Sequence, residues 1–334
     1  MRVLVTGGAG FIGSHLVDRL LADGHAVFVV DDCSTGSERN LDHHAGDDRL
    51  RFVRGSVLDE ELVTEISRDI EIVYHLAAAV GVRYVVDDPL WTIETNTRGT
   101  ENVLQQAVEN GARVVFASTS EIYGASDAIP FAEDGQRVLG PTWIPRWSYS
   151  TSKALDEHLC FALAEHGLDV SIVRYFNIYG PRMDPAGYGS VIAKFLTQAV
   201  EGEPLTVHGD GEQTRCFTYV SEAVDATVRA ATMPVALGEV FNIGSSDEIS
   251  INELAETVLR VADAAGCYAV GGGAPIGDDR IRHVTYEEAY GARFHDTRRR
   301  VPDVTKASEV LGWRAEIGLD DGLARTLATW DAAP

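Results

Sequence analysis

The sequence of 334 residues predicts a doubly wound α/β fold, in which helices cover a parallel β-sheet, with a smaller and irregular C-terminal lobe. Three observations predict it. Short β-branched runs alternate with longer segments of helical periodicity. A glycine-rich turn directly follows the first run, and the alternation stops near residue 177.

The elements follow from these patterns in chain order. Strands are expected at residues 2–5, 26–31, 51–54, 72–75, 114–118 and 170–174, and helices at 12–22, 91–109 and 152–166. Residues 1–176 are therefore expected to form the sheet domain. Residues 177–334 are rich in Gly- and Pro-containing loops, with helices expected at 191–201, 220–231 and 251–265. They are expected to form the second lobe, although some of its segments should return to the sheet domain.

Composition excludes several classes of protein. Lys plus Arg is 28 and Asp plus Glu is 51, which gives a formal charge of −23. A field of this sign repels nucleic acid and anionic lipid, so neither a nucleic acid nor a membrane is expected as a partner.

The four cysteines form no CxxC pair and the ten histidines form no HxxH or HExxH spacing, so no metal is expected. The apolar N-terminal stretch is too short for a signal peptide, which leads us to expect a cytoplasmic protein.

The glycine-rich turn is the first candidate binding site. Gly7, Gly8, Gly10 and Gly13 lie between the first expected strand and the helix after it. They allow a tight turn and a close approach of the backbone to a pyrophosphate, which the helix N-terminus stabilises. A tight strand-to-helix turn alone could also require these glycines. The surrounding strand and helix favour a dinucleotide.

The end of the second expected strand indicates which dinucleotide. Asp31 lies 18 residues after Gly13, where a carboxylate can accept hydrogen bonds from the adenosine ribose and would repel a 2′-phosphate. No arginine adjoins it in the sequence. NAD is thus favoured over NADP, although Asp31 could instead cap the turn that follows it.

Two further segments carry candidate catalytic groups. Thr119, Ser120 and Glu121 follow the fifth expected strand, and Tyr149 and Lys153 are four residues apart, which places them on one face of a helix. The Lys153 ammonium, together with a cationic nicotinamide, would lower the pKa of the Tyr149 phenol enough for it to act as a base. The Tyr-x-x-x-Lys spacing alone is common on helix surfaces.

In combination, these motifs resemble the extended short-chain dehydrogenase/reductase family, and within it the nucleotide-sugar epimerases, dehydratases and decarboxylases. The resemblance covers nearly the whole chain, including His75-Leu76-Ala77-Ala78 and Arg174-Tyr175-Phe176-Asn177. It implies a Rossmann-like NAD-binding domain, a nucleotide-sugar-binding lobe and a homodimer. It also implies that Thr119 bonds the sugar 4-hydroxyl, that Tyr149 removes its proton, and that Lys153 binds the nicotinamide ribose.

The residues after Thr119 indicate the branch of the family. Ser120 stands where the 4,6-dehydratases of the deoxythymidine type carry an acidic Asp. The Thr-Ser-Glu sequence resembles that of the UDP-glucuronate decarboxylases. It also resembles that of the GDP-mannose dehydratases, which prefer NADP. Arg300 and Pro302 resemble the decarboxylase motif whose arginine reaches the sugar C5 region. The three adjacent arginines 298–300 could instead be only a solvated basic turn.

The resemblance implies further contacts. The expected cofactor-binding residues are Gly7, Gly10, Phe11, Ile12, Gly13, Asp31, Ser56, Val57, Leu76, Ala77, Ala78, Asn96, Tyr149 and Lys153. The expected substrate-binding residues are Tyr84, Ser120, Asn177, Arg182, Val191, Lys194, Val207, His208, Arg215 and Arg300. Ser56 stands where many relatives carry an Asp that holds the adenine.

The leading interpretation is an NAD-dependent decarboxylase of UDP-glucuronate, with Thr119, Glu121, Tyr149, Lys153 and Arg300 as catalytic residues. Oxidation at carbon 4 makes the C5 carboxylate a β-keto acid, which loses carbon dioxide through an enolate; Arg300 and Glu121 would orient the carboxylate and relay a proton to C5. The product is expected to be UDP-xylose, UDP-4-keto-pentose or both. The alternatives are a nucleotide-sugar 4-epimerase or 4,6-dehydratase, and a non-catalytic NAD-binding regulator.

Overall fold

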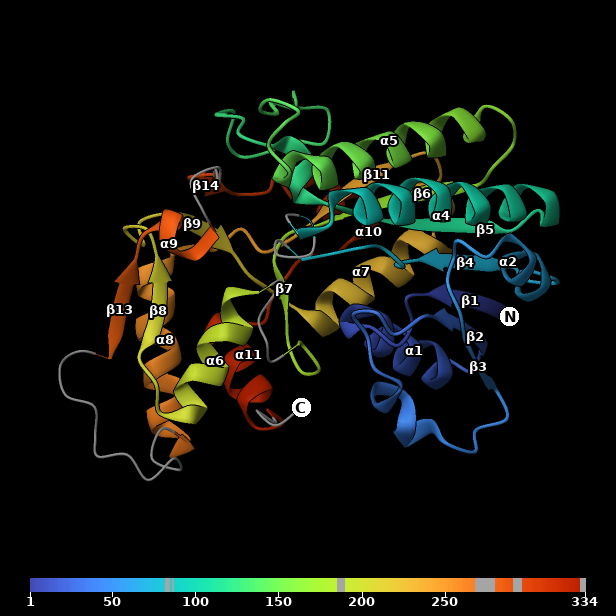
Figure 1. The fold of residues 1–334 in the computed structure, drawn as a ribbon. Coiled ribbons are helices and arrows are strands. Elements are labelled where there is room, and N and C mark those ends of the chain that lie inside the picture. The colour runs from blue at the N-terminus through green and yellow to red at the C-terminus, as the bar shows by residue number, and fades with distance from the viewer. Residues whose placement is uncertain (82–84, 86, 185–189, 268–279, 291–295, 331–334) are drawn as a thin grey trace.

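Seven parallel strands form the central sheet, in the order β11-β6-β5-β4-β1-β2-β3 (Figure 1). The computed structural model describes residues 1–334 apart from 82–84, 86, 185–189, 268–279, 291–295 and 331–334. The strands are β1 (Arg2–Thr6), β2 (Ala26–Asp31), β3 (Leu50–Arg54), β4 (Ile72–His75), β5 (Arg113–Thr119), β6 (Val170–Tyr175) and β11 (Val240–Ile243). The predicted doubly wound sheet is confirmed, and β11 adds a strand that the sequence patterns did not indicate.

Helices cover both faces of this sheet. One face carries α2 (Glu60–Ile66), α4 (Pro89–Asn110) and α5 (Arg146–Ala164), and the other carries α1 (Phe11–Ala22), α7 (Val220–Thr232) and α10 (Thr305–Leu311). Alternation along β1 explains the two cores, because Val3 and Val5 pack toward α1 and α7 while Leu4 packs toward α4. Short 3₁₀ helices are η1 (Glu38–His44), η2 (Ser120–Tyr123) and η3 (Pro234–Ala236).

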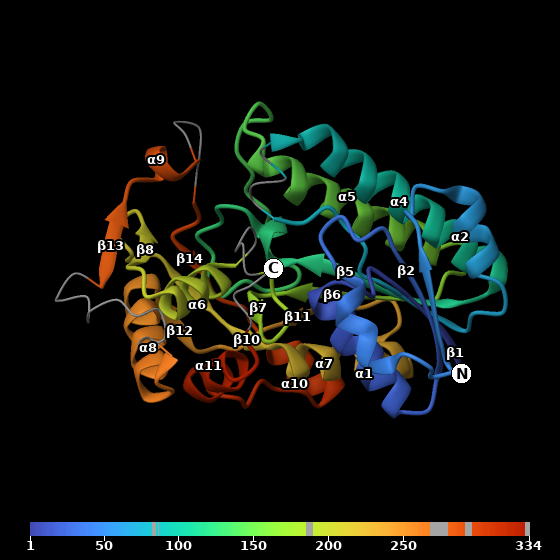
Figure 2. The ribbon, with the colours of Figure 1, turned by 60° about the horizontal axis from the view of Figure 1, so that its bottom comes forward.

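The second lobe has a core of its own, seen at the left of Figure 2. Phe195, Leu196, Leu254 and Val258 are fully or almost fully buried between its helices. Its helices are α6 (Val191–Glu201), α8 (Ile251–Ala264), α9 (Tyr286–Tyr290) and α11 (Leu319–Leu327). Its strands pair as β8 (Leu205–His208) with β13 (Ile281–Val284), β7 (Ile178–Tyr179) with β10 (Thr218–Tyr219), and β9 (Thr214–Cys216) with both β12 (Glu248–Ser250) and β14 (Arg299–Arg300).

The start of α5 differs from the prediction. The helix begins at Arg146, directly after Pro145, and not at residue 152. Proline is tolerated at the start of a helix, so the proline-containing segment before Tyr149 does not delay it. Consequently, Arg146, Tyr149 and Lys153 all belong to one helix.

The strand order places a crevice between β1 and β4, because the chain runs outward from β1 in one direction and from β4 in the other. Thr6 pairs with Val30 on one side and with His75 on the other. The turns after β1, β2, β4 and β5 therefore meet at the same edge of the sheet. The glycine turn, Asp31, Leu76 to Ala78 and Thr119 to Glu121 lie in or beside these turns.

Candidate active site

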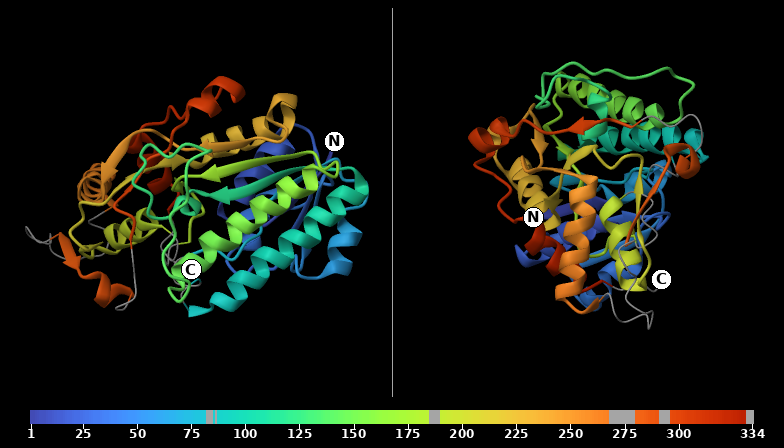
Figure 3. Two further views of the ribbon diagram at one scale, coloured as in Figure 1. Left: turned by 90° about the horizontal axis from the view of Figure 1, so that it is seen from above. Right: turned by 90° about the vertical axis from the view of Figure 1, so that its left-hand side faces the viewer.

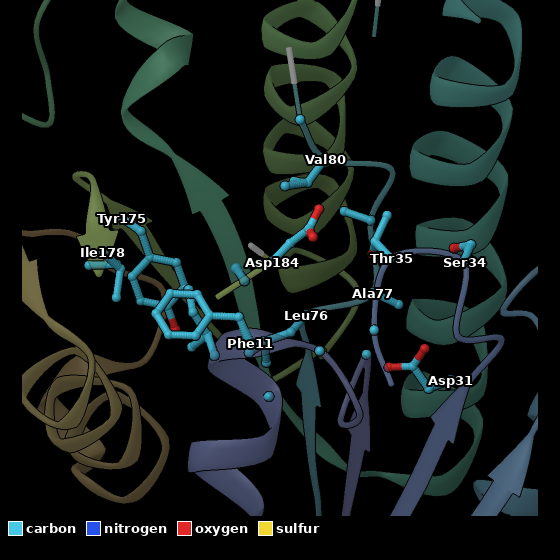
Figure 4. Close-up of a pocket in the computed structure, with 18 of the residues that line it drawn as sticks. Phe11, Asp31, Ser34, Thr35, Leu76, Ala77, Val80, Tyr175, Ile178 and Asp184 are labelled. Carbon is cyan, nitrogen blue, oxygen red and sulfur yellow. The ribbon is translucent and has the colours of Figure 1, made fainter. Parts of the chain in front are cut away.

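A cavity of about 800 Å³ lies along this edge and continues to the second lobe. Nineteen of the residues expected from the sequence line it, and Figure 4 shows part of its wall. They are Gly7, Gly10, Phe11, Ile12, Gly13, Asp31, Ser56, Val57, Leu76, Ala77, Ala78, Thr119, Ser120, Glu121, Tyr149, Lys153, Asn177, Arg182 and Arg300.

The glycine turn forms the floor of one half of the cavity. Gly7 has a positive φ of 72°, and its N–H donates to the Val30 carbonyl at 2.8 Å. A Cβ atom on Gly13 would lie 2.0 Å from the Gly7 carbonyl oxygen, so this position excludes any side chain. The glycine turn places the N-terminus of α1 at the cavity. The first helical turn of α1 contains no acidic residue. This arrangement fits a pyrophosphate.

Asp31 closes the far end of this half. Its carboxylate accepts hydrogen bonds from the backbone N–H groups of Ala9 at 2.9 Å and Cys33 at 2.8 Å. It therefore caps the turn and lines the cavity at once. Burial raises the pKa of this carboxyl above its ordinary value.

The wall around Asp31 includes residues that the sequence did not indicate: Asp32, Ser34, Thr35, Gly36, Ser37, Arg39 and Asn40. Arg39 is eight residues beyond Asp31, and η1 folds it back to the same wall. Gly36 also has a packing role, because a Cβ atom there would lie 2.8 Å from the backbone of Ala9. Figure 4 shows Ser34 and Thr35 opposite Ala77.

The candidate catalytic side chains lie at the end of β5 and on α5. The Thr119 hydroxyl accepts from the N–H of Glu121 at 3.2 Å and lies near the Tyr149 side chain. Burial, and then the charge of Glu121, raise the pKa of Tyr149, and the nearby Thr119 hydroxyl only partly offsets this rise. The phenol is therefore neutral until positive charge reaches it.

Lys153 lies below Tyr149 on the same helix. Its Nζ donates to the Ala117 carbonyl at 2.9 Å and sits 4.5 Å from the centre of the Phe116 ring. Burial lowers the pKa of this ammonium. The lowering of the Tyr149 pKa by Lys153 together with a bound nicotinamide stays a prediction.

Asn96 does not line the cavity but supports it. It is fully buried on α4, its Oδ1 accepts from the N–H of Ala79 at 2.8 Å, and its Nδ2 donates to Ser152 at 3.0 Å. The side chain thus joins the turn after β4 to the helix that carries Tyr149 and Lys153.

Two carboxylates and three guanidinium groups form a largely buried cluster at the end of the cavity that Glu121, Arg146 and Arg300 line. We call it the arginine cluster: Glu121, Arg146, Arg215, Asp296 and Arg300. Arg300 Nη1 lies 3.4 Å from Glu121 Oε1, and Arg215 Nη2 lies 2.9 Å from Asp296 Oδ1. Arg146 reaches both carboxylates.

The ionisable groups of the arginine cluster shift one another's pKa values. Burial raises the pKa of Glu121, but the charges of Arg300 and Arg146 outweigh burial and hold it below its ordinary value. Burial and the neighbouring Arg215 and Arg146 lower the pKa of Arg300 to about 10, against the attraction of Glu121. Arg300 therefore stays cationic near neutral pH, and Glu121 stays ionised.

Arg146 and Asp296 had no role in the sequence interpretation. Arg146 could have been found from its position three residues before Tyr149, had the helix been extended to Pro145. Asp296 comes next to Arg215 only through the tertiary fold.

Arg182 and Asn177 line the middle of the cavity. Arg182 has a positive φ of 67°, and its Nη2 donates to Asp18 at 2.8 Å. Its Nη1 is buried and has no hydrogen-bond partner among the described residues, which suits an anionic ligand. The Asn177 side chain donates to the Cys216 carbonyl at 2.9 Å.

Asp18 is also the centre of a group that could hold a metal ion, together with His43 and His44. Its Oδ1 lies 2.8 Å from Nε2 of each histidine. Burial raises the pKa of Asp18, but its hydrogen bonds to Arg182 and His44 lower it below its ordinary value. The group therefore holds Arg182 in place.

Four further residues expected to bind the substrate belong to the second lobe and do not line this cavity: Val191, Lys194, Val207 and His208. Lys194 Nζ lies 2.8 Å from Nε2 of His208, whose pKa burial and Lys194 lower to about 4. Val191 begins α6, and the side chain of Val207 is fully buried in the lobe's core. Tyr84 lies outside the described residues.

Other residues that line the cavity were missed because they come from strands, helices and loops far apart in the sequence: Val30, Gly55, Val80, Gly81, Val85, Thr95, Ala117, Ser118, Arg146, Tyr175, Ile178, Met183, Asp184, Ser190, Thr329 and Trp330. Figure 4 shows the Phe11 ring beside Tyr175 and Ile178.

Across the described part of the chain, no helix combines the length and apolar character needed to cross a membrane.

Comparisons with known proteins agree with this architecture. A family model described as GDP-mannose 4,6 dehydratase matches residues 4–326. A UDP-N-acetyl-alpha-D-glucosaminuronate decarboxylase from Bacillus cytotoxicus is 42% identical, over 98% of this chain and 96% of its own. A UDP-glucuronic acid decarboxylase from Xenopus tropicalis is 38% identical, over 98% of this chain and 71% of its own.

Comparison with solved structures identifies the same group of nucleotide-sugar enzymes. A dTDP-glucose 4,6-dehydratase from Streptomyces venezuelae, solved with NAD bound, has a TM-score of 0.85 and 31% identity, over 98% of this chain and 96% of its own. Together with the family model, these relatives establish the family. The chain belongs to the GDP-mannose 4,6-dehydratase family of extended short-chain dehydrogenases/reductases, which are nucleotide-sugar epimerases, dehydratases and decarboxylases.

Proposed function

We propose that this protein is an NAD-dependent decarboxylase of a UDP-linked uronic acid, with UDP-glucuronate as its substrate. The observation that carries the proposal is the arginine cluster, in which, among the described residues, three guanidinium groups pair with two carboxylates. A carboxylate on the sugar would balance the remaining positive charge, whereas a neutral hexose would leave it buried without a counter-charge. The names of both relatives, each a uronate decarboxylase, support the same reading.

The cavity suits NAD along its first half. The glycine turn of residues 7–13 would hold the pyrophosphate, Asp31 the adenosine ribose, Ser56 and Val57 the adenine, and Leu76 to Ala78 the nicotinamide side. Lys153 would bind the nicotinamide ribose. The chemistry that NAD would supply there is the reversible acceptance of a hydride from carbon 4 of the sugar.

The chain's own groups would supply the proton transfers. Thr119 would bond the 4-hydroxyl, and Tyr149 would take its proton once positive charge offsets the burial that raises its pKa. A ketone at carbon 4 makes the C5 carboxylate that of a β-keto acid, so loss of carbon dioxide needs little further catalysis. Thr119 and the Tyr149 hydroxyl would then stabilise the enolate oxygen.

Glu121 and Arg300 would act at carbon 5. Arg300 would orient the departing carboxylate, since it lies on the cavity wall and stays cationic. Glu121 is ionised at neutral pH, so it would first have to accept a proton from water before relaying one to C5. Release of the sugar before carbon 4 is reduced gives UDP-4-keto-pentose, and later release gives UDP-xylose.

The second lobe would bind the nucleotide of the substrate. Arg182 and Asn177 would contact the diphosphate. The rest of the substrate site would be formed by Tyr84, Val191, Lys194, Val207, His208 and Arg215. We accordingly propose residues 1–176 as the NAD-binding domain and 177–334 as the substrate lobe. Segments α7 and β11 pack with the sheet.

A homodimer is proposed through α4 and α5. These helices lie side by side on one face of the sheet (Figure 3). Ile93 and Val108 on α4 and Leu155 and Phe161 on α5 are exposed, at 42%, 37%, 55% and 38%. A second copy would bury such side chains, as in a four-helix contact.

The test is to incubate the purified protein with NAD and either UDP-glucuronate or UDP-N-acetylglucosaminuronate, and to weigh the nucleotide sugar by mass spectrometry. Decarboxylation gives a product lighter by the mass of carbon dioxide. An unchanged mass with inverted C4 would replace the proposal with a 4-epimerase, and loss of water from a UDP- or dTDP-hexose with a 4,6-dehydratase.

A further inference from the structure

Asp18, His43 and His44 bring three metal-ligating atoms together next to Arg182, and we call these three residues the histidine group. Asp18 Oδ1 lies 2.8 Å from Nε2 of each histidine, and the centres of the two imidazole rings are 4.1 Å apart. The three ligand atoms all lie within 4.8 Å of one another. Within the part of the chain that the structure describes, no other trio of His, Cys, Asp or Glu side chains converges in this way.

The histidine group joins two elements that border the cavity. Asp18 belongs to α1, and the two histidines end η1, 25 residues further along the chain. Arg39 and Asn40 of the same η1 line the cavity near Asp31, and Asn40 Nδ2 donates to the Ala9 carbonyl at 2.9 Å. A link between α1 and the end of η1 would therefore also hold this wall of the cavity.

The donor atoms of the group define the class of ion that fits. Two imidazole nitrogens and one carboxylate oxygen suit Zn²⁺ and similar transition ions, whereas Mg²⁺ and Ca²⁺ prefer oxygen ligands. Each neutral imidazole would bind through Nε2 and keep its proton on Nδ1. Bonds of about 2.1 Å at tetrahedral angles place ligand atoms about 3.4 Å apart, so an opening of about 0.6 Å from the present 2.8 Å between Asp18 Oδ1 and each Nε2 would admit the ion.

The surroundings of the group support such a site. The second carboxylate oxygen of Asp18 accepts from Arg182 Nη2 at 2.8 Å, which orients the carboxylate and leaves Oδ1 to the histidines. The side chains of Asp18, His43 and His44 are 30%, 46% and 19% exposed, so an ion can enter and keep a water molecule as its fourth ligand. The nearby His15 is not a ligand, because its Nε2 lies 2.9 Å from the Pro181 carbonyl oxygen.

Two charges act on the affinity in opposite directions. The formal charge of −23 on the whole chain attracts cations to its surface. The Arg182 guanidinium, which shares the Asp18 carboxylate, repels a second cation. An ion that exchanges with the solvent is therefore expected, and not one that is held permanently.

We propose that Asp18, His43 and His44 form an exchangeable site for a zinc-class divalent ion, which fastens η1 to α1 when it is bound. The site lies apart from the arginine cluster and from Tyr149, so the inference does not depend on the proposed decarboxylation. The ion would act on the stability of the cavity wall around Arg39 and would take no part in the chemistry.

The test uses the full-length protein, freed of metal by dialysis against a chelator and titrated with zinc chloride in a calorimeter. His43→Gln and His44→Gln each remove one ligand and leave the ion pair of Asp18 with Arg182 in place. His166→Gln is the matched control, because His166 is an exposed histidine outside the group. Hydrogen exchange at residues 38–44 reports the attachment of η1, and the melting temperature reports folding.

The wild-type protein should bind one zinc ion at this site. His43→Gln and His44→Gln should weaken that binding by at least about tenfold, whereas His166→Gln should change it by less than about twofold. Zinc should slow hydrogen exchange at residues 38–44 and raise the melting temperature of the wild type, because it binds the folded state. Magnesium chloride should do neither.

Equal zinc affinities in the wild type and both histidine variants would overturn the inference, and so would zinc binding that leaves exchange at residues 38–44 unchanged. His43 is the more exposed of the two histidines, so His43→Gln keeps the test decisive if His44→Gln does not fold. A protein that decarboxylates no uronate would remove the proposed function and leave this site standing.

Discussion

Arg300 and Glu121 are 179 residues apart in the sequence, yet their side chains lie 3.4 Å apart in the cavity wall. The two preceding arginines behave differently. Arg298 pairs with Asp210 and Arg299 with Glu248 on the exposed surface. Of the three adjacent arginines, only Arg300 lines the cavity among the described residues.

This difference gives a prediction with a built-in control. Arg300→Ala should lower turnover of UDP-glucuronate by at least about 100-fold, because it removes the cation proposed to orient the carboxylate. Arg299→Ala should leave turnover unchanged, since it loses only an exposed ion pair. Steady-state assays by product mass measure both. Unchanged turnover in Arg300→Ala would remove this residue from the mechanism.

Tyr149→Phe should lower turnover by about 100- to 10,000-fold, the usual contribution of a general base. NAD binding, followed by quenching of protein fluorescence, should remain within about threefold, because the change removes one hydroxyl on α5 and leaves the glycine turn intact. Retained turnover would mean that another group takes the proton.

Gly13→Ala should weaken NAD binding by at least about tenfold, because the new Cβ would lie 2.0 Å from the Gly7 carbonyl and force the turn to move. Gly318→Ala is the matched control, since a Cβ atom there would have no neighbour within 4 Å and the residue is the N-cap of α11. Calorimetric titration with NAD measures both variants. Equal affinities would contradict the assignment of this turn to the pyrophosphate.

Asp156 gives a prediction on stability. Burial raises its pKa from 3.8 to about 7, which outweighs the nearby charge of Lys153. The folded state then binds the proton more tightly than the unfolded state, so stability is fully present below about pH 4 and falls as the pH rises toward 7. Asp156→Asn should abolish this fall, which amounts to at most about 4 kcal/mol.

Urea unfolding at pH 5 and pH 8 measures the difference in the free energy of unfolding for the wild type and the variant. The exposed Asp48→Asn is the control and should keep the wild-type dependence on pH. An Asp156→Asn variant that loses as much stability as the wild type between these values would show that other groups cause the fall.

The proposed dimer predicts that Ile93→Glu combined with Leu155→Glu yields a monomer, because the two charges would have to be buried between α4 and α5 of two copies. Val235→Glu, at a 60% exposed position of η3, should not change the molar mass. Light scattering reports the mass. A monomeric wild-type protein, or a dimer that survives both substitutions, would exclude this interface.

The sheet was predictable because its pattern is local. The runs that became β1 to β6 are β-branched and separated by helical periodicity, and six of the seven strands were found. β11 was missed because Val240–Ile243 is a four-residue strand in a stretch of short, irregular elements. The first six residues of α5 were missed because Pro145 reads as a break, although it lies where a helix can begin.

Part of the candidate site was also predictable from local sequence motifs, and the rest depends on contacts between distant segments. The glycine turn, Asp31, Thr119 and the Tyr149–Lys153 pair each follow from a short motif. The approach of Arg146 to Asp296 depends on how two lobes meet, and the return of Arg39 to Asp31 on how η1 folds back. No local pattern encodes such long-range contacts.

The most direct measurement uses UDP-glucuronate labelled with ¹³C in its carboxyl group, incubated with the NAD-loaded protein in heavy water and followed by NMR. The account predicts that labelled carbon dioxide and bicarbonate appear while the pentose gains one deuteron at C5. Retention of the labelled carboxyl on the sugar while C4 inverts would contradict it.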